Sequence, residues 1–141
     1  MSAAWANTDP VFRQVHPNHW DGKAPNSVAF SPTPKDEDKL SVDDASLVTA
    51  EGSWSHFTKK LGFQSVGTWA VSFGEIDAAG DLELVRNPLV DPVDALKNNP
   101  AHCLIDFSRL SSKGQKKKRA QELAIKASAR GCQFQPTAGA D

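Results

Sequence analysis

Side chains that bind charged, flat molecules gather in one stretch of the chain, residues 12–42. Arg13 and His16 lie close together there, and Trp20 follows them. A guanidinium group binds phosphate through paired hydrogen bonds, and an indole ring stacks on flat or cationic groups. The stretch therefore predicts a site for a flat, anionic ligand. The structural alternative is that Arg13 pairs with one of the acidic residues 36–38 and that Trp20 closes the edge of the core.

Two carboxylates and one hydroxyl complete this candidate site. Glu51 and Glu75 fall in segments that we expect to be ordered, and Glu75 is predicted to end a strand after the small residues Ser72 and Gly74. A carboxylate facing a cleft acts as a general base or holds a ribose hydroxyl; the alternative is a solvated strand end. Ser41 lies between two apolar residues. Because no Gly-x-Ser-x-Gly elbow surrounds it, the sequence argues against a serine-hydrolase nucleophile.

A His-x-x-His pattern at His16 and His19 has the spacing of half a metal site. Pro17 excludes the helix that would aim both rings in one direction. His102 and Asp106 are the next candidates by residue type, but four residues along a strand span roughly 13 Å. They are therefore too far apart for one ion. We expect no metal site, and we expect the loop histidines to bond to backbone or water.

Composition excludes several classes of protein. The chain has 141 residues, 39% of them hydrophobic, and a net charge of −1, which suits one globular domain without the basic excess of a nucleic-acid or membrane-surface binder. The basic run Lys116–Arg119 begins a helix, where the dipole opposes it; we expect a solvated face, with one or two of its charges along the apolar stripe. No phosphate-binding glycine loop is present.

Cysteine usage and the amino terminus indicate a cellular compartment. Cys103 and Cys132 are too few for a disulfide scaffold, and we expect both as buried free thiols. The start of the chain has no basic segment and no apolar run, and no stretch is long enough to span a membrane. We therefore expect a cytoplasmic protein.

The pattern of apolar residues predicts an α+β fold with a mainly antiparallel sheet, two longer helices and one short helix. The early connections are too short for parallel crossovers. We expect a flexible lead-in at 1–10, a single α+β domain at 11–136 and a flexible tail at 137–141. Strands are predicted at 11–15, 28–30, 40–42, 67–76, 82–85 and 102–107, with an edge strand at 133–135; helices are predicted at 50–62, 92–99 and 112–130.

Three details of these elements position the candidate site. Strand 82–85 is predicted to return beside strand 67–76 as a hairpin. Thr49 is the expected N-cap of the first helix, and His56 falls off its apolar stripe, so we expect His56 to be exposed. The last helix is expected to bury a stripe of small and aliphatic residues, namely Ala120, Leu123, Ala124 and Ala127.

Several segments resemble a group of short bacterial proteins over residues 12 to about 131. The resemblance implies a bacterial origin and no particular reaction. The segments that carry it are Arg13-x-Val15-His16-Pro17, Ser27-x-Ala29-Phe30-x-Pro32-Thr33-x-x-Asp36, Leu40-Ser41-Val42 and His102-x-x-Ile105-Asp106-Phe107.

The order of elements more loosely resembles ADP-ribosyltransferase-like domains, including the RES-type toxins. These open with a strand bearing Arg or His, continue through a loop into a short strand with a polar side chain, and then enter a helix. The resemblance implies that Arg13 or His16 binds the pyrophosphate or ribose of NAD and that Ser41 lines the pocket. It also implies that Glu51 or Glu75 is the polarising acid.

Two hypotheses follow from these residues, and whether the protein is an enzyme stays open. The first is a small enzyme or binder of a nucleotide-like anion, with NAD as the candidate cofactor. It predicts that Arg13, His16 and a carboxylate converge in one concave pocket. The second is a non-catalytic interaction or regulatory module of a bacterial operon, which predicts an apolar surface patch instead. Ligand-binding candidates are Arg13, His16, Trp20 and Ser41; catalytic candidates are Glu75, Glu51 and His16.

Overall fold

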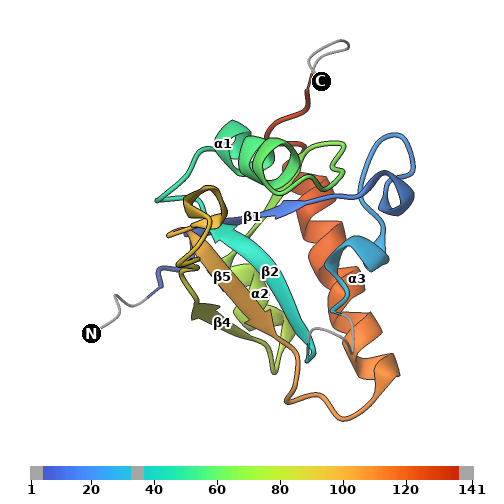
Figure 1. The fold of residues 1–141 in the computed structure, drawn as a ribbon. Coiled ribbons are helices and arrows are strands. Elements are labelled where there is room, and N and C mark those ends of the chain that lie inside the picture. The colour runs from blue at the N-terminus through green and yellow to red at the C-terminus, as the bar shows by residue number, and fades with distance from the viewer. Residues whose placement is uncertain (1–4, 33–36, 137–141) are drawn as a thin grey trace.

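The computed structural model describes residues 5–32 and 37–136, and its centre is a five-stranded sheet in which all neighbours run antiparallel. The long helix α3 packs beside this sheet (Figure 1). The predicted α+β fold with an antiparallel sheet is confirmed. In the order β3-β1-β2-β5-β4 the strands are β3 (Thr68–Ser72), β1 (Pro10–Gln14), β2 (Lys39–Asp44), β5 (His102–Asp106) and β4 (Glu83–Arg86).

The helices begin where side chains cap them. The Thr49 hydroxyl accepts a hydrogen bond from the Gly52 amide at 2.9 Å, and the Ser112 hydroxyl accepts one from Gln115 at 3.2 Å. These bonds satisfy amides that have no partner inside the helix, and the predicted cap at Thr49 is confirmed. The helices are α1 (Ala50–Ser55), continued by a π-helical segment (His56–Lys60), α2 (Phe73–Ala79) and α3 (Lys113–Arg130).

The core lies between the sheet and α3. The predicted stripe of α3 is confirmed, because its four members are all buried. α3 packs against β3, α2 and a 3₁₀ turn at Ser27–Phe30. The strands contribute alternate residues to this core, so the intervening residues of β2 and β5 point to the other face. Those core residues include Val11, Leu40, Val42, Trp69, Val71, Leu84, Cys103 and Ile105.

The predicted strand 67–76 is wrong after Ser72, where the chain becomes helix α2. The Ser72 hydroxyl accepts from the Glu75 amide at 3.1 Å, and the Glu75 carboxylate accepts from the Ser72 amide at 2.8 Å. This reciprocal pair is a capping box, which starts a helix. Glu75 is therefore the third residue of a helix and not the end of a strand.

Two further strand predictions are wrong. Residues 28–30 form part of a 3₁₀ turn, because the Asn26 side chain accepts from the Val28 amide at 3.0 Å and starts a turn there. Strand β4 pairs with β5, with Leu84 opposite Ile105, and not with β3 as a hairpin. Helix α2 intervenes and carries the chain across to the other edge of the sheet.

Smaller differences lie at three other places. The short helix expected at 92–99 is only a 3₁₀ turn at Ala95–Lys97, and the edge strand expected at 133–135 is a single bridge from Phe134 to Thr68. Cys132 is exposed, whereas Cys103 is buried as predicted. Within the described ranges, no helix has both the length and the apolar character that a membrane span requires.

Residues 5–9, expected as part of a flexible lead-in, pack against the body of the protein. The Trp5 ring stacks on Phe73 with centroids 6.4 Å apart, and the Arg86 guanidinium lies 3.9 Å from the Trp5 ring centroid. The Gly74 amide donates to the Asn7 carbonyl at 2.9 Å. These contacts join the start of the chain to α2 and β4. The tail expected at 137–141 lies outside the described residues.

Candidate functional site

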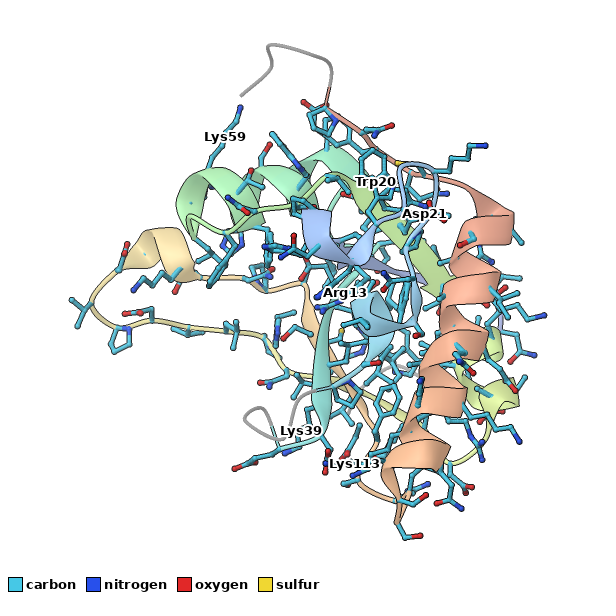
Figure 2. All side chains as sticks on the ribbon, turned by 90° about the vertical axis from the view of Figure 1, so that its right-hand side faces the viewer. Arg13, Trp20, Asp21, Lys39, Lys59 and Lys113 are labelled. Atoms are coloured by element: carbon cyan, nitrogen blue, oxygen red, sulfur yellow. The ribbon has the colours of Figure 1, made fainter. Side chains whose placement is uncertain are left out.

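The site begins where β1 and β2 separate. Their pairing ends at Phe12 and Asp43, and β1 then turns away from β2 (Figure 1). The Arg13 side chain occupies the gap: its Nε donates to the Ala29 carbonyl at 2.7 Å and one terminal nitrogen donates to the Ser41 carbonyl at 3.0 Å. Figure 2 shows Arg13 near the middle of the molecule. We call this point, where β1 and β2 separate after Phe12 and Asp43, the fork of the sheet. The guanidinium group of Arg13 links the two sides of the fork.

A cavity of about 170 Å³ lies at this fork. Figure 1 shows that α1 with its π-helical continuation and the loop 87–101 lie near the same end of the sheet. The π-helical segment and the loop both contribute residues to the cavity wall. Its wall is mainly apolar, with polar groups from the strands. The strands supply Phe12, Arg13, Gln14, Ser41, Val42, Asp43 and His102; the helical segment and the residues after it supply His56, Phe57, Leu61 and Phe63; the loop supplies Leu89 and Asn99.

The wall from the helical segment has π-helical hydrogen bonding. The Leu61 amide donates to the His56 carbonyl five residues earlier, at 3.0 Å, which is the π-helical pattern. After the segment ends, the Phe63 amide donates to the Phe57 carbonyl six residues earlier, at 3.1 Å. A π-helical turn is rare and often occurs at functional sites, because it moves side chains away from their α-helical positions. Here it places His56 and Phe57 at the cavity.

A serine and a histidine are hydrogen-bonded at the polar end of the cavity. The Nε2 atom of His102 lies 3.1 Å from the Ser41 hydroxyl, and Nδ1 lies 2.8 Å from the Asn87 carbonyl. A carbonyl oxygen only accepts, so we assign the ring proton to Nδ1. In the neutral ring, Nε2 then presents a lone pair to the Ser41 hydroxyl. This is the arrangement of a nucleophile, its base and a group that orients the base.

His56 adds a second imidazole to the cavity wall. It was predicted to be exposed, which is wrong, because the π-helical turn brings it to the cavity and leaves it half-buried. Its Nε2 atom is buried and has no hydrogen-bond partner among the residues that the structure describes. Buried polar atoms normally have partners. The indole nitrogen of Trp20, which does not line the cavity, also lacks one among the described residues, so the unpartnered nitrogen does not by itself indicate a ligand site.

A hydrogen-bonded network behind the cavity connects its walls to the sheet. The Asp43 carboxylate accepts from the Ser53 hydroxyl at 2.7 Å and from the Asn99 side chain at 2.8 Å. Gln14 donates to Ser53 at 2.9 Å. Asp43 therefore holds α1 and the loop 87–101 against β2, and its two oxygens are already engaged. Its role is to position the walls.

Of the residues predicted to bind ligand, Arg13 and Ser41 lie at the cavity and two others do not line it. The Nδ1 atom of His16 accepts from the Asn18 amide at 3.0 Å and caps a 3₁₀ turn. Trp20 lies in the loop after β1, on the side of α3 (Figures 1 and 2), and packs against the core. Arg13, His16 and a carboxylate therefore do not converge at this cavity as predicted: Arg13 lies there beside Asp43, but His16 does not.

The two predicted acids lie elsewhere. Glu75 forms an ion pair with Arg130 at 2.6 Å, besides its capping bonds. Burial raises the pKa of Glu75, but hydrogen bonds from Arg130 and from the Ser72 amide outweigh it and lower the pKa overall. Glu51 is exposed in the first turn of α1. Neither carboxylate lines the cavity.

The structural alternative for Arg13 is an ion pair with one of the acidic residues 36–38, and two of these three pair with lysines instead. Of the acidic residues 36–38, Glu37 lies 3.6 Å from Lys39 and Asp38 forms an ion pair with Lys116 at 3.1 Å. Asp36 lies outside the described residues. Lys116 and Arg119 are the half-buried members of the basic run, and Lys117 and Lys118 are exposed.

The histidine and cysteine pairs give no stronger site. The rings of His16 and His19 lie 5.6 Å apart, and the pKa of His19 is lowered by burial and then by the charges of His16 and Arg13. Within 5–32 and 37–136, no three His, Cys, Asp or Glu side chains are grouped as metal ligands. Burial raises the pKa of Cys103 to about 11, which makes its thiol unreactive at neutral pH.

Sequence reasoning missed the partners of Ser41. His102 was considered only as a metal ligand, and His56 only as an exposed residue. Alternation did place Ser41 and His102 opposite the apolar faces of their strands. Their proximity depends on the pairing of β2 with β5, in which Ser41 lies opposite Leu104. No local pattern contains that pairing.

Comparisons with models of protein families, with curated proteins and with solved structures find no match to this chain.

Proposed function

We propose that the cavity at the fork binds a small ligand made of one ring or a short apolar group with a hydrogen-bonding head. A cavity of 150 Å³ binds benzene, and the cavity here measures about 170 Å³. Phe57, Leu61 and Phe63 provide its apolar wall. The observation that carries the proposal is the cavity itself, where this apolar wall lies together with the hydrogen-bonded pair of Ser41 and His102.

The polar groups define the head of the ligand. Ser41 and His102 both donate and accept, and Arg13 adds a positive charge near them. Asp43 is negative but is occupied by two donors. The site therefore favours a neutral or singly anionic head, such as a carboxylate, an amide or an ester.

The cavity of about 170 Å³ is too small to enclose the whole of the nucleotide-like ligand that the sequence predicts. NAD would place its nicotinamide ring in the cavity and leave the adenosine part outside. ADP-ribosyl transfer has less support than ring binding, because neither of its expected acids, Glu51 and Glu75, lines the cavity.

A thermal-shift and calorimetry panel tests the proposal with benzamide, nicotinamide, benzoate and NAD at millimolar concentration. We expect at least one single-ring compound to raise the melting temperature. Leu89→Trp fills the cavity and should abolish that shift. Val93→Trp is the matched control, because Val93 is on the same loop but 94% exposed and outside the cavity. No shift with any single-ring compound, or an undiminished shift in Leu89→Trp, contradicts the proposal.

A second candidate function is protein binding by the loop 87–101. Val90 is 80% exposed and Val93 is 94% exposed, and Leu89, the loop residue that lines the cavity, is 38% exposed. Exposed apolar residues in close sequence are typical of interaction sites. The double change Val90→Ser and Val93→Ser should remove a co-purifying partner that Ile125→Ser, an exposed position on α3, retains. Identical partner recovery from both variants argues against this function.

A further inference from the structure

We propose that Ser41 is a nucleophile for acyl transfer, with His102 as its base, and that the substrate is a small carboxylic ester whose ring or alkyl part occupies the cavity. This inference rests on the proposed ligand site, because the cavity is where the substrate would be held. It adds a reaction, which ligand binding alone does not require.

The geometry of the pair carries the inference. A base must lie within hydrogen-bonding reach of the proton that it removes, and the His102 Nε2 atom is 3.1 Å from the Ser41 oxygen. The Asn87 carbonyl, 2.8 Å from Nδ1, fixes the orientation and the tautomer of the ring. Ser41 is exposed, so a substrate can approach its oxygen. The three groups come from β2, from β5 and from the residue after β4, and these strands are paired neighbours in the sheet.

The reaction balances with water as the only co-reactant. The Ser41 oxygen attacks the ester carbonyl carbon while its proton moves to Nε2 of His102, and the carbonyl electron pair moves to oxygen. Collapse of the tetrahedral intermediate breaks the bond to the leaving oxygen, which takes the proton from Nε2 and departs as the alcohol. Water then attacks the acyl-serine and gives a proton to Nε2. The acid leaves, and Ser41 recovers its proton from His102.

The developing oxyanion needs a donor, and His56 is suited to supply it. His56 lines the cavity, and its Nε2 atom is buried within the protein without a hydrogen-bond partner among the described residues. With its proton on Nε2 and the ring turned toward the cavity, His56 would donate to the oxyanion. A histidine side chain can serve as such a donor, and removal of one donor costs on the order of 10²–10³-fold in kcat. His56, one of the residues that line the proposed ligand site, thus has a role in the reaction.

The group that orients His102 also narrows the substrate class. A backbone carbonyl carries no formal charge, so it stabilises the imidazolium less than the carboxylate of a full triad does. The base is correspondingly weak at the moment of attack. We therefore infer that esters with good leaving groups, such as aryl esters, react, and that amides do not.

Hydrolysis of 4-nitrophenyl acetate and labelling by a fluorophosphonate, mapped by mass spectrometry, test the inference. We expect label on Ser41, no label in Ser41→Ala, and a rate that falls on the order of 10²–10⁴-fold in His102→Gln. His56→Gln should lower kcat more than it changes KM. Ser108→Ala is the control, because Ser108 is exposed and outside the cavity. Circular dichroism and melting temperature verify that each variant is folded.

Two results separate this inference from the proposed ligand site. If a single-ring amide such as benzamide binds the wild type while no label reaches Ser41 and no ester is hydrolysed above the Ser41→Ala background, the nucleophile is refuted and the ligand site stands. If no single-ring compound binds and no label appears, both are refuted.

Discussion

Arg13 holds the fork of the sheet, and replacing it with methionine should destabilise the whole fold. Its guanidinium group donates to the Ala29 carbonyl at 2.7 Å and to the Ser41 carbonyl at 3.0 Å. Methionine keeps most of the apolar length of the side chain but removes both donors. The Ala29 carbonyl is partly buried, so the loss of the Arg13 donor leaves it without this hydrogen bond in a place where water replaces it poorly.

The magnitude follows from these two bonds. A hydrogen bond to a charged group contributes about 1.5–3 kcal/mol. The bond to Ser41 is at an exposed position, where water replaces the lost donor, so we count it at about 0.5–1 kcal/mol. The expected loss in the free energy of unfolding is therefore about 2–4 kcal/mol. Arg13→Lys should lose nearly as much, because a compact ammonium group does not span both carbonyls.

Urea unfolding followed by tryptophan fluorescence measures this loss. The control is Lys118→Met, which removes one positive charge from an exposed position of α3 and should change the free energy by less than about 0.5 kcal/mol. If Arg13→Met is equally neutral, Arg13 does not hold the fork. A neutral Arg13→Met that also loses ring binding would show that Arg13 acts on the ligand, as the sequence first indicated.

Three further predictions test parts of the fold. Glu75→Gln should lower the free energy of unfolding by about 1 kcal/mol at neutral pH. The pKa of Glu75 in the folded protein lies below its ordinary 4.5, so the carboxylate stabilises the fold above pH 4.5 and this stabilisation is lost as pH falls through the folded pKa. The free energies of unfolding of wild type and Glu75→Gln should therefore converge in acid. A difference that persists there would contradict the ion pair with Arg130. Gly67→Ala places a Cβ atom 2.6 Å from the Phe134 carbonyl and should cost about 1–3 kcal/mol and speed proteolysis of the carboxyl-terminal segment, and unchanged thermal melting would refute that contact. Ser112→Ala should cost about 1 kcal/mol by removing the cap of α3, measured by thermal melting against Ser108→Ala.

The predictions that the structure confirms were those that depended on neighbours in sequence. The cap at Thr49 and the buried stripe of α3 are encoded within one or two helical turns, so local residue types suffice to identify them. The error at Ser72 was also local. The capping box of Ser72 and Glu75 was present in the sequence, but the alternation before it was extended too far.

The sequence by itself therefore determined the class of fold, the strands β1, β2 and β5, and the two longer helical segments. Only the tertiary structure decided the candidate site. Ser41 and His102 are 61 residues apart and meet because β2 pairs with β5 in one particular register. Shifting that register by one residue would turn one of these side chains into the core, and which strands pair is decided by the burial of the whole sheet against α3.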